Sequence, residues 1–437
     1  MPYDIIIGRN NSDKKLFGKR GLVYLGKGYV KMGQYTSLSN PIYMDVARSH
    51  VVLVSGKRGS GKSYSLGVIA EELSQIPEEA RNIASLIFDT MGIFWTMKYE
   101  NNKDKQLLSE WNLETKKLPV KIFVPYKYFE EYKNKGVPVD EPFALNVSDM
   151  KAEDWVLVFG LDIIHPVSVL IERAIYRLNE SLADYDISNI ILNIINDNDA
   201  TKEDKNAATG LFEAASTWGI FASKGDKETR IKDLVTPGIT SVLDLSVYNS
   251  VGAFNVRALV IGLVCRKLFS ERMMARKEEE VDSIRYGNYS TYSSSRESPL
   301  VWIFVDEAHE FLPREGKTPA SDSLIQLLRE GRQPGLSLVL ATQQPGEIHR
   351  DVMTQSDIVL SHRLTAQPDI EALNKIMQTY LLEGIKKSID DLPNLKGSAI
   401  ILDDNSERIY PMRVRPRFTW HGGEAPSSVK PEKNFSG

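Results

Sequence analysis

Short apolar runs, most of them closed by a polar residue, alternate along the chain with segments of helical periodicity. Residues 51–55 and 86–89 are two such runs, and the segment 64–73 between them repeats apolar residues at helical spacing. Further runs lie at 121–124, 239–245, 301–305, 336–341, 358–361, 399–402 and 409–414. Buried parallel strands give continuous apolar runs, and helices are their usual connections. The pattern therefore predicts an α/β fold with a mostly parallel, doubly wound sheet.

Other stretches depart from this alternation. In 150–235 apolar residues recur at three-and-four spacing, as in Val167, Leu170, Ile171 and Ala174, which predicts an inserted helical bundle. Residues 1–48 alternate short apolar runs with Gly and Asn, which predicts a few β-hairpins and shows no helical period.

These patterns divide the chain into five parts. A short β-rich N-terminal region covers 1–48, the first part of the core 49–149, the helical bundle 150–235, and the second part of the core, with the C-terminal strands, 236–423. The polar tail 424–437 is expected to be disordered. A long helix at 256–280 leads into a Tyr/Ser-rich stretch at 286–298, which we expect to be a mobile loop.

The composition is that of an ordinary globular protein, with 437 residues, 42% hydrophobic and 26% charged. The net charge of -4 excludes a uniformly basic nucleic-acid coat, but it allows a ring whose basic groups face its bore. The single cysteine, Cys265, excludes an intramolecular disulfide framework and lies at a predicted buried helix position. No apolar stretch is long enough to span a membrane and no signal peptide is visible, so we expect a cytoplasmic protein without an integral membrane segment.

A phosphate-binding motif lies between the first core strand and the helix that follows it. It has the form G-x-x-x-x-G-K-S, and its residues are Gly56, Lys57, Arg58, Gly59, Ser60, Gly61, Lys62 and Ser63, followed by Tyr64. Glycines let backbone N–H groups converge on phosphate oxygens, and the helix N-terminus adds its positive dipole end. These residues are predicted to bind ATP, with Lys62 on the β and γ phosphates and the Ser63 hydroxyl on Mg²⁺. A Gly-rich turn that binds nothing is the alternative.

An apolar strand at 301–305 ends in Asp306 and Glu307. Asp306 is predicted to join the Mg²⁺ shell, and Glu307 is predicted to polarise the attacking water. The letters Asp-Glu-Ala-His also occur in the DEAH box of superfamily-two helicases. No other motif of that class is present, so we interpret His309 as structural.

Two further candidates lie farther along the chain. Gln343 follows the strand at 336–341 and is predicted to sense the γ-phosphate or to position water; a capping amide is the alternative. Arg332 lies just before that strand, at its far end, so it is predicted to serve a neighbouring subunit's nucleotide as an arginine finger. A solvated loop arginine is the alternative. The finger interpretation predicts a ring.

Several stretches in register resemble one family. They are GKRGSGKSYSLGVIAEEL, IFVDEAHEFLP, LLREGRQPG leading into ATQQP, and RVRPRFTWHGG, and they span most of 45–423. The chain resembles the HerA-like ATPases of the HerA/FtsK superfamily, hexameric motors that move double-stranded DNA. The resemblance implies a RecA-like P-loop NTPase core in 49–149 and 236–423. Carried over residue by residue, it implies phosphate and Mg²⁺ residues (Lys62, Ser63), a Walker B pair (Asp306, Glu307), a sensor (Gln343) and a finger in trans (Arg332). It also implies an acidic residue near the site that takes part in catalysis (Asp89) and an arginine beyond the sensor strand that binds the nucleotide (Arg363).

The sequence also departs from the family. Only about 45 residues precede the first core strand, where members usually have a full β-barrel. Residues 90–95 lack the Pro-His-Gly-Glu type of run, and Gln344 stands where many members have arginine. These departures bear on the partner and the substrate.

The leading hypothesis is an ATP-driven double-stranded DNA translocase or helicase, acting as a homohexamer with a NurA-type nuclease. Alternatives are a DNA pump for conjugation, packaging or defence, an ATP-gated module that regulates a nuclease, and a protein remodeller of the AAA+ kind. Four sets of basic residues are candidate DNA contacts. The first is Lys127, Lys133 and Lys135 in a predicted loop at 126–136, and the second is Arg272, Arg276 and Lys277. The third is Arg285 and Arg296, and the fourth is Arg413, Arg415 and Arg417 on one predicted strand face. The last set fits a neighbouring subunit equally well.

Overall fold

The structure is a computed structural model that describes residues 3–32, 35–76, 82–182, 184–222, 228–249, 254–286, 298–376, 389 and 391–423. The predicted mobile loop, apart from its first and last residues, and the predicted disordered tail lie outside the described residues. None of the described helices is long and apolar enough to cross a membrane.

One sheet runs through the described part of the molecule, in the order β1-β3-β2-β13-β12-β11-β4-β10-β9-β5-β8-β6-β7. Its strands are β1 (Ile5–Ile7), β2 (Leu22–Met32), β3 (Tyr35–Asp45), β4 (Val51–Ser55), β5 (Ile83–Asp89), β6 (Val120–Pro125), β7 (Glu141–Phe143), β8 (Thr240–Asp244), β9 (Leu300–Val305), β10 (Leu336–Thr342), β11 (Ile358–His362), β12 (Ser398–Asp403) and β13 (Arg408–Val414). From β11 to β7 every pairing is parallel, whereas β12, β13 and β2 pair antiparallel with their neighbours. The prediction of an α/β fold on a mostly parallel sheet is confirmed.

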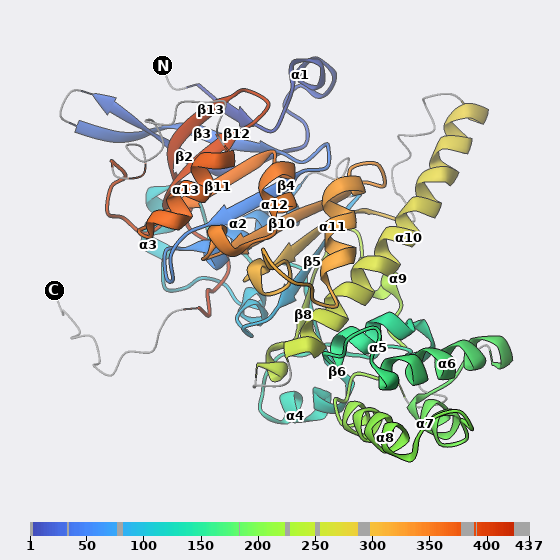
Figure 1. Cartoon of the computed structure of the whole chain (residues 1–437). Helices are drawn as coiled ribbons and strands as arrows, with labels where there is room; N and C mark the ends of the chain where they lie inside the picture. The colour runs from blue at the N-terminus through green and yellow to red at the C-terminus, as the bar shows by residue number, and fades with distance from the viewer. Residues whose placement is uncertain are drawn as a thin grey trace, which may run out of the picture.

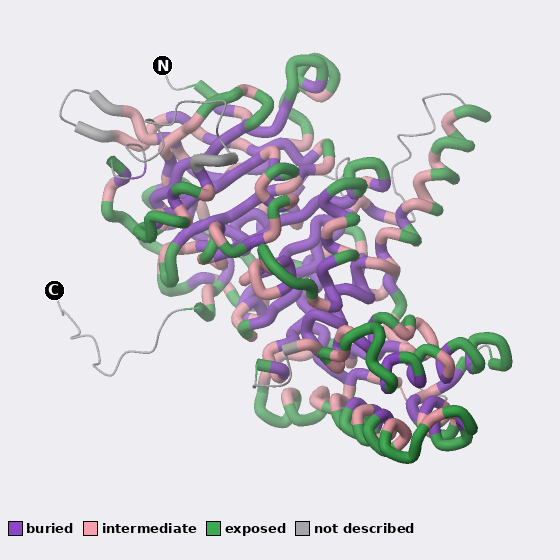
Figure 2. Tube along the Cα trace, viewed as in Figure 1, coloured by how far each residue is buried: buried purple, intermediate pink, exposed green. Residues whose placement is uncertain are grey.

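Helices cover both faces of the sheet (Figure 1). The helices of the described residues are α1 (Asn11–Phe17), α2 (Lys62–Leu73), α3 (Lys105–Glu110), α4 (Phe129–Asn134), α5 (Ala152–Val158), α6 (Pro166–Ser181), α7 (Ile187–Ile195), α8 (Lys202–Ser216), α9 (Ile231–Leu234), α10 (Phe254–Tyr286), α11 (Ser321–Glu330), α12 (Arg350–Gln355) and α13 (Gln367–Ile376). Along β10, Leu338 packs with α10 and α11 in one apolar cluster, whereas Val339 packs with α2 in the other. Successive strand residues point to opposite faces, so a strand covered on both sides has to be apolar throughout. Figure 2 shows this buried layer running through the middle of the molecule.

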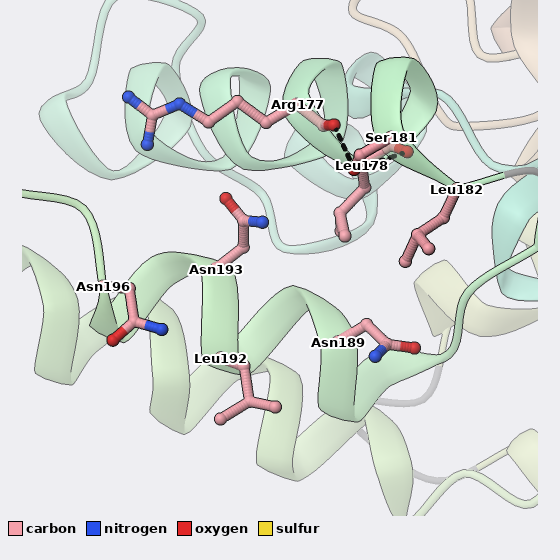
Figure 3. Close-up of a pocket in the computed structure, with 8 residues that line it drawn as sticks. All are labelled: Arg177, Leu178, Ser181, Leu182, Asn189, Leu192, Asn193 and Asn196. Atoms are coloured by element: carbon pink, nitrogen blue, oxygen red, sulfur yellow. Dashed lines mark hydrogen bonds between the residues drawn. The ribbon is translucent and has the colours of Figure 1, made fainter.

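The helices α5, α6, α7 and α8 fall within the segment 150–235 and lie together beyond one end of the sheet (Figure 1). The centre of this group of helices is the fully buried Trp155, whose ring lies 4.8 Å from that of Phe212. A groove of about 320 Å³ separates α6 from α7, and Asn193 of α7 points across it toward α6 (Figure 3). None of the residues that line this groove belongs to the motifs described above.

The N-terminal region departs from the expectation of hairpins alone, because residues 11–17 form the helix α1. Asn10 caps this helix by accepting a hydrogen bond from the Asp13 backbone N–H at 2.8 Å. A helix of only about two turns carries too few apolar residues to show a helical period. The long helix α10 also extends six residues beyond its predicted end at 280.

Candidate active site

The loop between β4 and α2 is shaped by its glycines. Gly59 and Gly61 have φ values of 74° and 113°, a region that residues with a Cβ seldom adopt. A Cβ at Gly56 would lie 2.4 Å from Ser60 Oγ, so this turn leaves no room for a side chain. Ser60 Oγ is buried and has no hydrogen-bond partner among the described residues. A loop of this shape at a helix N-terminus can turn successive backbone N–H groups toward an anion.

Lys62 and Ser63 begin α2 and meet the end of β9. The Ser63 hydroxyl donates to Asp306 Oδ2 at 2.5 Å, across 243 positions of sequence. Lys62 and Asp306 are both buried. Within the described residues, no group of three or more His, Cys, Asp or Glu side chains is placed to hold a metal ion. The Ser63 hydroxyl and the Asp306 carboxylate offer oxygen ligands of the kind that Mg²⁺ takes, and phosphate and water oxygens can supply the rest of its shell.

Glu307 follows Asp306 in a left-handed backbone conformation, with φ of 50°. Such a conformation is uncommon for a residue with a side chain and is found where a site requires it. Burial, together with the charge of Asp306, raises the pKa of Glu307 to about 7, although the Gln343 backbone N–H and Lys62 act in the opposite direction. Its Oε2 atom is buried and accepts no hydrogen bond from any residue that the structure describes. Glu307 is therefore a basic carboxylate that its own chain leaves partly unsatisfied.

His309 lies closer to this site than a purely structural interpretation of the sequence implied. Its Nδ1 is 3.6 Å from Glu307 Oε2 and 3.2 Å from Thr342 Oγ1, at the end of β10. Burial lowers the pKa of His309, so the ring is neutral near pH 7. The only signal in the sequence was its position two residues after Glu307.

His362, at the end of β11, had no sequence signal, yet it lies directly beneath the phosphate loop. Its Nε2 is 2.9 Å from Ser65 Oγ and its Nδ1 is 3.1 Å from the Ser398 carbonyl oxygen. Burial lowers its pKa to about 4, so Nδ1–H donates to Ser398 and Nε2 accepts from Ser65. A Cβ at Gly61 would lie 3.4 Å from this ring. His362 thus ties α2 to two strands of the sheet.

Asp89 ends β5, and its carboxylate is occupied by its own loop. It accepts backbone hydrogen bonds from Met91, Gly92 and Phe94 at 3.2, 2.8 and 2.7 Å. Burial, together with the neighbouring Asp244 at the end of β8, raises the pKa of Asp89 to about 7. The structure therefore gives Asp89 a clear role in shaping the loop at 90–94.

The remaining candidates differ in their distance from the phosphate loop. The Gln343 backbone N–H contacts the Glu307 carboxylate, and the Arg363 carbonyl oxygen accepts from the Lys57 N–H at 3.2 Å. Arg332 is exposed and precedes β10, a strand of seven residues. At about 3.3 Å per residue this strand is roughly 23 Å long, so Arg332 and Gln343 lie at opposite ends of it.

A comparison with known families identifies the family of this chain. Residues 30–267, more than half of the chain, match the family model described as the central domain of the helicase HerA. This chain belongs to the HerA family. The resemblance inferred from the motifs is thereby confirmed.

Curated relatives match this HerA-family chain over a shorter length. It is 27% identical over 180 residues to the DNA double-strand break repair helicase HerA of Pyrococcus furiosus, which covers 38% of this chain and 31% of that protein. It is also 27% identical over 153 residues to the probable DNA double-strand break repair helicase HerA of Methanocaldococcus jannaschii, covering 32% of this chain and 30% of that protein. The chain thus spans about a third of the length of these relatives.

Two solved structures share the fold. VirB4 of Thermoanaerobacter pseudethanolicus superposes with a TM-score of 0.54 at 12% identity, covering 91% of this chain and 96% of VirB4. The bacterial conjugative coupling protein TrwBdeltaN70 does so with a TM-score of 0.51 at 13% identity, covering 86% and 87%. At these identities the likeness concerns the fold alone.

Two of the arginines expected on one strand face of this HerA-family chain lie elsewhere. The strand β13 ends at Val414, and Arg415 and Arg417 are 0% and 1% exposed. Arg415 Nη1 and Arg417 Nε bind the two carboxylate oxygens of Glu71 in α2 at 2.9 and 3.1 Å. The prediction that they contact DNA or a neighbouring subunit is wrong, because both are internal ion-pair partners.

Arg272 is also buried, and its guanidinium donates to the carbonyl oxygens of Pro334 and Ser298 at 2.9 Å each. It is therefore excluded as a DNA contact. The segment 126–136, expected as a loop, instead forms a 3-10 turn, η3 (Tyr126–Tyr128), and the helix α4, with Lys127 and Lys133 exposed. Arg296 lies outside the described residues.

Proposed function

We propose that this chain is an ATP-driven translocase or helicase of double-stranded DNA that works as a homohexameric ring. The observation that carries the proposal is the 2.5 Å contact between Ser63 and Asp306, with Glu307 as the next residue. It supports the proposal because it joins the phosphate loop to the strand end whose two carboxylates we assign to magnesium binding and to general-base catalysis. Membership of the HerA family supports DNA as the polymer that is moved.

In this proposal the amides of 56–63 and the Lys62 ammonium bind the β and γ phosphates of ATP. The unpartnered Ser60 Oγ and the tight glycine turn fit a bound phosphate. Ser63 and Asp306 hold Mg²⁺, which neutralises phosphate charge when it is bound. Tyr64 and Arg363 flank this cradle, since Tyr64 follows Ser63 directly and the Arg363 backbone binds Lys57.

Glu307 orients the attacking water and accepts its proton. A carboxyl whose pKa is about 7 is a stronger base than an ordinary glutamate, and it can still release the proton near neutral pH. Gln343 follows β10 and already contacts Glu307 through its backbone, so its side chain is well situated to sense the γ-phosphate. We propose no proton transfer for Asp89, whose carboxylate holds its own loop.

Arg332 acts in trans, on the nucleotide of the next subunit. Its exposure, and the strand length that separates it from its own phosphate loop, support this role. A guanidinium supplied across an interface neutralises charge in the transition state, which makes hydrolysis depend on the ring. The family resemblance extends the proposal to a nuclease partner of the NurA type.

The first test measures phosphate release by the purified chain with Mg²⁺ and ATP, with and without linear duplex DNA. We expect DNA to stimulate release, and Glu307→Gln to lower it by about 10²- to 10⁴-fold while ATP still binds. Lys62→Ala serves as the control that loses binding. DNA-stimulated hydrolysis that survives in Glu307→Gln would rule out the assigned base. Slow turnover that is indifferent to DNA would instead identify an ATP-gated module.

The second test mixes two inactive variants, Arg332→Ala and Lys62→Ala. In a mixed ring some interfaces combine an intact phosphate loop from one subunit with an intact arginine from its neighbour. We therefore expect the mixture to regain a fraction of the wild-type activity. If no mixing ratio restores turnover although both variants assemble, Arg332 does not act in trans.

A further inference from the structure

The C-terminal segment 415–423, here called the strap, lies along α2 and runs toward the phosphate loop. It is anchored at Glu71 through Arg415 and Arg417. The Arg417 backbone N–H also donates to Tyr64 Oη at 2.7 Å, and the next two backbone N–H groups, of Phe418 and Thr419, return to Glu71 at 3.0 Å each. The strap therefore contacts α2 at two places, at Glu71 in its far half and at Tyr64 in its first turn, directly after Ser63.

At this first turn the strap presents an imidazole ring. The rings of His421 and Tyr64 lie 5.3 Å apart between centroids and meet edge to face at 78°. His421 Nδ1 lies 3.3 Å from Arg417 Nη1 and must accept from it, because a guanidinium can only donate. Arg417 in turn is held by Glu71 and by Thr419 Oγ1, at 3.1 and 2.8 Å. The ring is thus fixed in orientation by buried side chains.

The direction in which ATP lies along the phosphate loop determines which part of the nucleotide is near His421. In the proposed complex Lys62 binds the β and γ phosphates and Ser63 the magnesium ion. We place the α-phosphate and the nucleoside on the side of the next residue, Tyr64. Aromatic rings stack on nucleobases and contribute about 1–3 kcal/mol per base. We infer that the strap forms the wall of the nucleoside subsite and that His421 stacks on the purine base of ATP. This inference rests on the proposed ATPase function.

The neighbouring Trp420 provides a matched control on the same strap. Side chains in an extended segment alternate between two sides. Thr419 Oγ1 bonds to Glu71 and His421 packs on Tyr64, so both point toward α2. Trp420 points away from α2 and is 39% exposed. Replacing it perturbs the strap without removing the ring beside Tyr64.

The experiment measures dissociation constants of the full chain, with Mg²⁺, for ATP and for ribose 5-triphosphate, which has no base. The variants are His421→Leu, which keeps the volume without an aromatic ring, His421→Phe, which keeps a ring, and Trp420→Ala. We expect His421→Leu to weaken ATP about fivefold or more and to leave ribose 5-triphosphate unchanged. His421→Phe is expected to retain most of the affinity for ATP, and Trp420→Ala to behave as wild type.

Three outcomes would overturn the inference. The first is that His421→Leu changes the affinities for ATP and for ribose 5-triphosphate equally, or changes neither. The second is that His421→Phe loses as much affinity for ATP as His421→Leu does. The third is that Trp420→Ala loses as much affinity for ATP as His421→Leu does. A wild-type chain that hydrolyses ATP while showing any of these keeps the proposed function and loses only the base contact. A wild-type chain that binds neither triphosphate refutes the proposed function itself.

Discussion

The anchor of the strap is a single buried carboxylate, and its removal has a calculable cost. Glu71 is fully buried in α2 and binds Arg415 and Arg417. It also accepts the backbone N–H groups of Phe418 and Thr419, at 3.0 Å each, and the Thr419 hydroxyl at 2.5 Å. Glu71→Ala removes an acceptor that two guanidinium groups, two backbone N–H groups and the Thr419 hydroxyl share.

Breaking a buried ion pair from one side costs about 3–5 kcal/mol, because the remaining charge stays buried. Arg415 keeps a second partner in Glu72 at 2.8 Å, which limits the loss on that side. We therefore expect Glu71→Ala to lower the free energy of unfolding by about 3–5 kcal/mol. Burial alone would raise the pKa of Glu71, but Arg415 and Arg417 outweigh it and the pKa is lowered. The stabilisation is therefore complete above the ordinary glutamate range and is lost as the pH falls below it.

Equilibrium urea unfolding, followed by tryptophan fluorescence, measures this difference between wild type and variant. Glu213→Ala, on the exposed side of α8, is the control and is expected to change stability by less than about 0.5 kcal/mol. Limited proteolysis provides a second measurement, since a released strap is cut sooner within 415–423. A Glu71→Ala protein as stable as Glu213→Ala, with an equally protected strap, would refute this account of how the strap is held.

Other predictions concern a close pair of buried carboxylates and two glycines within helices. Burial and the nearby Asp244 raise the pKa of Asp89 to about 7, so the free energy of unfolding decreases as the pH rises through about 7. Asp244→Asn is expected to reduce the loss of free energy of unfolding that is measured between pH 5 and pH 8. Gly210→Ala in α8 meets open space and is expected to raise the free energy of unfolding by about 0.5–1 kcal/mol. Gly262→Ala in α10, whose Cβ would lie 2.4 Å from the Pro319 carbonyl oxygen, is expected to destabilise the protein in the same unfolding assay.

The phosphate loop and the Asp306–Glu307 pair could be found in the sequence because each is a continuous stretch. Glycine spacing, a buried strand before the loop and a helix after it are all local properties. Arg332 could also be placed at the far end of β10, since an apolar run fixes which end of a parallel strand a residue occupies. Parallel strands bring their carboxyl ends to one edge, so the meeting of Ser63 with Asp306 followed from the two motifs.

Which charged and polar side chains are buried could not be predicted from the sequence in this way. Nothing near Arg415 or Arg417 in the sequence distinguishes them from exposed strand residues, because their partner Glu71 lies 344 and 346 positions away. His362 reaches Ser65 across 297 positions, and it required the folded sheet to set β11 beside β4.

The sequence by itself determined the family, the α/β sheet and the two motifs that make up the phosphate and magnesium site, since these depend on neighbouring residues and on strand direction. Only the tertiary structure decided which charges are internal and how the C-terminal strap reaches the first turn of α2. The physical reason is that a buried ion needs a partner, and the partner is supplied by whichever chain segment folding brings there.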